Sequence, residues 1–219
     1  MLKLALAVVI LLSLLGFDVN KRDTVALKGD RPVILFFGNS QAGTFSELIP
    51  WTDHTFWYLR ENLPQFEFRV AHEQGTTTDD WANQTSWTDT AVALLPADAF
   101  IIGCTHHDPT VVSAGDFKTN LEVIIARDAG AAWFINKIPK DPDNLPVSAT
   151  DTAIQALNSE IQDLCDENSN VFCCYDAYTD LDTGADFGSL TSTRHPDASG
   201  TAKIGAGLVT CLTANQGEI

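Results

Sequence analysis

The chain has 219 residues, enough for one sizeable domain and too few for two ordinary ones. Apolar residues make up 45% of it and charged residues 19%, a composition that supplies a core and excludes a disordered chain. Its 29 acidic residues outnumber 13 basic ones and give a net charge of −16. Such a field repels phosphate backbones and anionic lipid surfaces, so we expect no nucleic-acid partner.

The N-terminus has the layout of an export signal. Lys3 precedes an apolar run over residues 4–17, and polar residues follow it. A signal peptide has an apolar segment of about 7–15 residues, whereas a membrane-spanning helix needs roughly 20. We expect residues 1–22 to be a signal peptide or an N-terminal membrane anchor, the alternative being a buried helix of the domain. The chain is then extracytoplasmic, either secreted or anchored to the membrane by residues 4–17.

Residues 23–219 predict one domain in which apolar runs alternate with amphipathic segments. Continuous apolar runs predict strands buried on both faces, and apolar residues at helical spacing predict the helices between them. This alternation indicates an α/β fold, a three-layer α/β/α sandwich with a central parallel sheet of about five strands. The predicted strands are Val33–Phe37, Phe66–Ala71, Ala99–Ile102, Ala132–Ile138 and Val171–Tyr175, and the clearest helices are 116–129, 151–166 and 198–212.

Five cysteines fit an exported protein with one or two disulfides and a thiol left over. Cys173 and Cys174 are adjacent, and neighbouring residues of a strand point to opposite faces of a sheet. Each therefore needs a different partner, although the sequence leaves the connectivity open.

We expect no metal site. His72, His106, His107 and Asp108 follow the second and third predicted strands, but adjacent residues of one loop seldom hold the same ion. The spacing of paired cysteines or histidines that marks a metal site is absent from the sequence.

In open parallel sheets, functional groups gather at the carboxyl ends of the strands. Ser40 follows the first predicted strand through Gly38, and His195 directly precedes the last predicted helix. Taken singly, Ser40 is an ordinary helix N-cap and His195 an ordinary loop residue. Together they predict a serine nucleophile and its general base.

These residues resemble the SGNH (GDSL-type) hydrolases. The first block of that family, Gly-Asp-Ser after an apolar strand, is similar to Gly38-Asn39-Ser40, and its last block is similar to the segment from Ser192 to Gly200, with His195-Pro196 at its centre. The resemblance implies a flavodoxin-like SGNH hydrolase fold and no cofactor. It also implies an oxyanion hole formed by the backbone N–H groups of Ser40 and Gly75.

The chain departs from the family pattern at two positions. Where the family's third block has Asn as an oxyanion donor, this chain has Thr105 or, with one residue of slip, His106. Where the family has Asp three residues before the histidine, this chain has Ser192. The third member of a triad is then Ser192 or Asp186 of the preceding loop, or the pair acts as a Ser40–His195 dyad.

The resemblance implies an esterase or acylhydrolase that acts on small-molecule or glycan esters, including O-acetyl carbohydrate. The alternative is a catalytically impaired surface or virion protein of the same fold that binds glycans or assembles with partners. A third class is acyl transfer to a glycan by the same Ser–His pair. The oligomeric state is open.

Overall fold

The computed structural model describes residues 31–38, 55–72, 75–83, 97–103, 108–141, 149–187 and 196–219. The chain divides into two units, 1–31 and 32–219, and every described helix and strand lies in the second. The predicted leader, residues 1–22, lies outside the described ranges. Within those ranges, no helix combines the length and apolar character that crossing a membrane requires.

Five parallel strands form one sheet in the order β2-β1-β3-β4-β5. This confirms the predicted parallel sheet, and each predicted apolar run overlaps a strand. The strands are β1 (Val33–Gly38), β2 (Glu67–His72), β3 (Ala99–Ile102), β4 (Ala132–Ile135) and β5 (Val171–Cys173).

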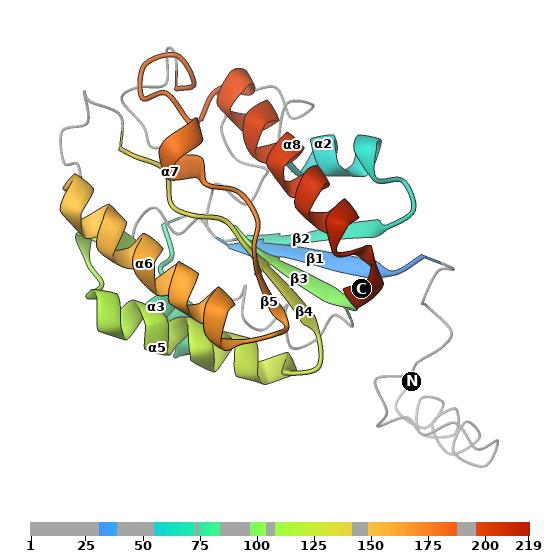
Figure 1. Ribbon diagram of the computed structural model, residues 1–219, viewed down its shortest axis with the longest axis horizontal. Helices are drawn as coiled ribbons and strands as arrows, with labels where there is room; N and C mark the ends of the chain where they lie inside the picture. The colour runs from blue at the N-terminus through green and yellow to red at the C-terminus, as the bar shows by residue number, and fades with distance from the viewer. Residues whose placement is uncertain are drawn as a thin grey trace, which may run out of the picture. The chain divides into compact units, whose positions relative to one another are not determined.

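Helices cover both faces of the sheet (Figure 1). The three predicted helices are confirmed as α5, α6 and α8, whereas the shorter α2, α3 and α7 were not predicted, because a helix of four to eight residues carries little periodic pattern. On one face lie α3 (Thr78–Ala82), α5 (Ala114–Ile125) and α6 (Asp151–Glu167), and on the other α2 (Thr55–Asn62), α7 (Ala177–Asp180) and α8 (Ala198–Ala214). Short 3₁₀ turns are η3 (Asp108–Thr110), η4 (Ala126–Asp128) and η6 (Gln216–Glu218).

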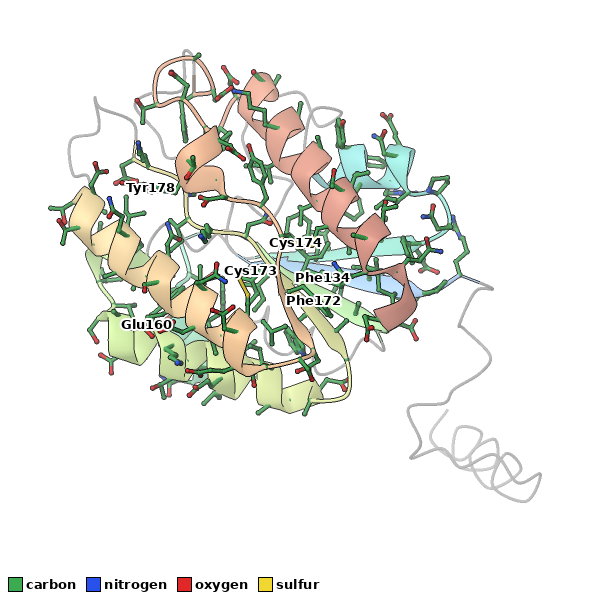
Figure 2. All side chains as sticks on the ribbon, viewed as in Figure 1. Phe134, Glu160, Phe172, Cys173, Cys174 and Tyr178 are labelled. Atoms are coloured by element: carbon green, nitrogen blue, oxygen red, sulfur yellow. A yellow bond between two sulfur atoms is a disulfide. The ribbon has the colours of Figure 1, made fainter. Side chains whose placement is uncertain are left out.

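The core consists of two apolar layers, one on each face of the sheet. Successive strand residues alternate between them: Leu35 belongs to the layer under α5 and α6, and Phe36 to the layer under α2 and α8. Phe134 and Phe172 of neighbouring strands stack with ring centroids 5.2 Å apart (Figure 2). Because both faces are buried, the central strands carry apolar residues at every position.

Two disulfides join adjacent residues at the end of β5 to helices on the two faces of the sheet, as the alternation of strand side chains predicts. Cys173 bonds to Cys165 of α6 and Cys174 bonds to Cys211 of α8, so the adjacent pair links helices on opposite faces (Figure 2). The expectation that each needs a different partner is confirmed. Since these four cysteines are paired, Cys104 is the one left without a disulfide partner in the chain.

The strand order sets where a site can form. After β1 the chain pairs β2 on one side of it and then crosses to pair β3 on the other. The connections that leave β1 and β3 therefore diverge, and in open α/β sheets ligands bind in the crevice at this switch point. The carboxyl ends there are Gly38 of β1 and Ile102 of β3.

The two disulfides are expected to contribute unequally to stability. In the chain-entropy account, closing the 37-residue separation of Cys174 and Cys211 stabilises by about 4 kcal/mol, against about 2.5 kcal/mol for the 8-residue separation of Cys165 and Cys173. Guanidinium unfolding of the two double Cys→Ala variants measures this, with Cys104→Ala as control for the loss of a thiol alone. A larger loss for the Cys165/Cys173 pair would contradict it.

Candidate active site

The candidate site lies at the carboxyl edge of the sheet, where Gly75 begins the described part of the connection from β2 to α3. Gly75 has φ of +78° and is exposed, and a Cβ built on it meets nothing within 4 Å. Backbone conformation rather than space therefore favours glycine at this position. Gly75 is the residue whose backbone N–H the resemblance to the SGNH family implies as an oxyanion donor.

The three threonines after Gly75 have three different partners. Thr76 accepts a hydrogen bond of 2.9 Å from the indole N–H of the buried Trp81. Thr77 is the N-cap of α3 and forms a capping box with Asp80. Thr78 donates to the carboxyl of Asp108 through its backbone N–H and its hydroxyl. The turn at Gly75 is thus held in place by the residues that follow it.

Asp108 is a buried carboxyl that sequence reasoning did not place in the site. Its Oδ1 accepts from the backbone N–H of Thr78 at 2.9 Å and from the Thr78 hydroxyl, and Asn120 of α5 donates to that hydroxyl at 3.4 Å. Its Oδ2 is buried and has no hydrogen-bond partner among the described residues. Burial raises the pKa of Asp108 to about 7, against the lowering effect of the Thr78 hydrogen bonds, and the negative charge of Asp80 adds to the rise.

Asp186, a carboxyl that the sequence suggested for the site, is also buried, but hydrogen-bond donors surround it. It accepts from the ammonium of Lys203 at 2.6 Å, from the N–H of Asp182 at 2.7 Å and from the hydroxyl of Ser199 at 3.0 Å. Burial acts to raise the pKa of Asp186, but these hydrogen bonds outweigh it and hold the pKa below its usual range. At neutral pH this side chain is therefore a carboxylate.

The backbone of Asp186 also holds the start of α8. Its carbonyl accepts from the N–H of Asp197 at 2.8 Å, and the Asp197 side chain caps α8. A Cβ on Gly200 would lie 2.5 Å from the same Asp186 carbonyl oxygen, so glycine is required for this close approach. These contacts fix the chain two residues after His195 against Asp186.

Several predicted site residues lie outside the described part of the chain. The side chain of His72 also lies outside the described part of the structure, so the expectation of no metal site stays a prediction. Within the described residues, no group of three or more His, Cys, Asp or Glu side chains is arranged to hold a metal ion. The predicted residues outside the described ranges are Ser40, Thr105, His106, Ser192 and His195.

The chain matches no protein-family model and no curated protein. Solved structures do match, over nearly the whole of their own length. A lipase/acylhydrolase from Enterococcus faecalis is 17% identical with a TM-score of 0.67, covering 84% of this chain and 96% of its own. The psychrotrophic esterase EstA from Pseudoalteromonas sp. is 11% identical with a TM-score of 0.66, covering 85% and 99%. A member of the lipolytic G-D-S-L family from Veillonella parvula is 15% identical with a TM-score of 0.64, covering 83% and 98%.

The chain has the SGNH hydrolase fold. This confirms the fold that the Gly38 and His195 blocks imply. In the SGNH hydrolase fold of this chain, Gly38 ends β1 two residues before Ser40, and α8 begins three residues after His195. Figure 1 shows α8 starting beyond the carboxyl edge of the sheet and running back along it.

The carboxyl of Asp108 should make stability depend on pH with a definite sign. With a pKa of about 7 when folded and 3.8 as its ordinary value, the folded state holds the extra proton between these two pH values. Stability is therefore lost as pH rises through this window. Asp108→Asn removes the titrating carboxyl. Between pH 5 and pH 8 the free energy of unfolding of the variant should therefore rise by about 2.5 kcal/mol relative to that of the unmodified chain.

Guanidinium unfolding of both proteins at several pH values in this range measures the difference. A difference that stays constant from pH 5 to pH 8 would show that the folded-state carboxyl titrates as it does in the unfolded chain.

Proposed function

We propose that this chain is an exported serine esterase of SGNH type that cleaves acyl esters through Ser40 and His195. The observation that supports the proposal is the fold: β1 ends at the switch point with Gly38, two residues before Ser40 in the chain, and α8 begins at the same edge of the sheet with Ala198, three residues after His195. A serine and a histidine on these two connections match the nucleophile and general base of the family. The solved structures with this fold include an acylhydrolase and an esterase.

In the proposed reaction, the Ser40 hydroxyl attacks the ester carbonyl carbon while His195 takes its proton. The tetrahedral intermediate places negative charge on the former carbonyl oxygen. The N–H groups of Ser40 and Gly75, with the side chain of Thr105 or His106, stabilise that oxygen. His195 then gives its proton to the leaving alcohol, and water attacks the acyl group on Ser40 to release the acid.

Asp186 and Ser192 are the two candidates to orient the His195 imidazole. Asp186 is supported by its charged state and by its bond to Asp197, two residues after His195. Its Oδ1 accepts a hydrogen bond from the hydroxyl of Ser199, and a carboxylate oxygen can accept a second. Such a bond would hold the tautomer and stabilise the imidazolium that forms during the reaction.

For the substrate we propose small-molecule or glycan esters, with O-acetyl groups of extracellular carbohydrate as the leading class. An exported, acidic protein meets such glycans outside the cell, where its charge of −16 disfavours anionic lipid surfaces. In a chain of 219 residues only a small insertion is available for a lid, which argues against long acyl chains as substrates. We propose export by residues 1–22, with residues 4–17 as the membrane attachment where the leader is retained.

The second candidate function is a catalytically impaired surface or virion protein that binds glycans or assembles with partners. It is favoured by the two departures from the family pattern, at Thr105 or His106 and at Ser192. Against it stands the presence of both Ser40 and His195, which binding alone does not need. Acyl transfer by the same pair differs from hydrolysis in requiring an acceptor alcohol.

Ser40→Ala should abolish hydrolysis of a short activated acyl ester and of acetylated xylan, because the variant lacks the attacking oxygen. We expect kcat/KM to fall by about 10³-fold or more, and His195→Ala to fall similarly. Release of acid without an added acceptor separates hydrolysis from transfer. The measurement is initial rates on purified protein whose fold is checked by circular dichroism.

Ser113→Ala is the matched control, since Ser113 is the N-cap of α5 and accepts from the N–H of Asp116 at 3.2 Å. It should lose about 1 kcal/mol of stability and keep its activity. If Ser40→Ala behaves like Ser113→Ala, Ser40 is a cap and the esterase proposal fails.

A further inference from the structure

Asp108 is the buried titratable group that the proposed mechanism does not use. Asp108 is fully buried, and among the described residues its carboxyl accepts hydrogen bonds from Thr78, both of which reach one oxygen, Oδ1. The second oxygen lacks a partner among the described residues. Leaving a buried carboxyl oxygen unpaired costs stability. Stability alone therefore does not explain why a carboxyl is buried here.

The backbone of Asp108 is fixed as firmly as its side chain. Its carbonyl accepts from the N–H groups of Val111 and Val112 at 2.9 and 2.8 Å, which anchors η3 ahead of α5. On the other side of the contact, Thr78 is the first residue of α3, three residues after Gly75. The carboxyl thus joins two well-defined pieces of backbone that are 30 residues apart in the chain.

These two pieces belong to connections on either side of β1. Thr78 lies in the connection that leaves β2, at the start of α3, and Asp108 lies in the connection that leaves β3, at the start of η3. In the sheet, β1 lies between β2 and β3. The Asp108–Thr78 contact therefore couples the connections that flank the strand leading to Ser40. In the sequence, residues 104–107, which include Thr105 and His106, connect Gly103, the residue after β3, to Asp108.

We propose that Asp108 is a positioning residue of the oxyanion hole: by its bonds to Thr78 it fixes the connection after β3 relative to Gly75, so that donors from both connections meet at one oxygen. This inference rests on the proposed function. Asp108 touches neither substrate nor reacting atoms in this account, and it acts through the loop it holds. The donor side chain and the Gly75 N–H must be aligned together, because a displacement of about 1 Å can cost 10²-fold in rate.

The test compares three variants by their kinetics. Asp108→Ala removes the acceptor, and we expect kcat to fall about 10- to 100-fold with KM changed less than about threefold, since an oxyanion hole acts on the transition state. Asp108→Asn keeps an oxygen for Thr78 and should restore most of kcat. Asp98→Ala is the matched control, because Asp98 accepts from the N–H of Val33 at 2.8 Å at the opposite end of β3; it should keep kcat within about twofold.

A second measurement works without any hydrolytic activity. Cys104 is the one cysteine outside the two disulfides and lies in the connection that Asp108 is proposed to hold. The rate at which a chromogenic aromatic disulfide modifies it reports on how that connection is fixed. We expect this rate to rise about tenfold in Asp108→Ala and to stay unchanged in Asp98→Ala.

The two readouts separate the possible failures. If the unmodified chain hydrolyses no ester but Asp108→Ala accelerates modification of Cys104, the positioning role stands and the esterase proposal fails. If the chain is active, kcat decides: full kcat in Asp108→Ala, or an equal loss in Asp98→Ala, overturns the positioning role. If the chain is inactive and modification of Cys104 is unchanged, both proposals are overturned.

Discussion

Burial of the central strands on both faces is the constraint on which the rest of this molecule depends. With Leu35 facing one apolar layer and Phe36 the other, the sheet has no face left for water or substrate. Helices must cover both sides, and every polar function is confined to the ends of the strands. Because the connections that leave β1 and β3 diverge, a ligand can bind at the carboxyl edge of the sheet near Gly38.

At that edge, two buried carboxyls hold segments of the chain, and they do so under opposite electrostatic conditions. Asp186 is paired with Lys203 and remains charged, so its bonds to the start of α8 are strong at neutral pH. Asp108 receives two hydrogen bonds from Thr78, and its pKa of about 7 leaves it only partly ionised near neutrality. One carboxyl lies beside the connection that carries His195, and the other ends the connection that carries the candidate oxyanion donors.

The sequence was sufficient to predict the sheet and its long helices, because burial on both faces leaves continuous apolar runs and a long helix repeats its pattern several times. It also indicated separate partners for Cys173 and Cys174, since the alternation of a strand is a property of the backbone. The same reasoning located the edge of the sheet at which Ser40 and His195 are expected. The placement of their side chains stays a prediction.

What the sequence could not supply were contacts made by polar residues far apart in the chain. Thr78 and Asp108 are 30 residues apart, and neither lies in a periodic pattern that marks it as buried. The link between Asp186 and Lys203 likewise depends on how α8 packs, not on local propensity. A carboxyl soon after a buried strand and a run of threonines after Gly75 were the available signals, and each alone fits an exposed turn equally well.

The central claim, that Ser40 is an activated nucleophile, is tested most directly by covalent capture. The chain would be treated with an alkyl fluorophosphonate, which phosphonylates a serine only where a base and an oxyanion hole activate it, and then analysed by intact mass and peptide mapping. The account predicts one adduct per chain, on the peptide that contains Ser40, and no adduct when His195 is replaced by Ala. A folded chain that takes up no phosphonate, or takes it up on another serine, would contradict it.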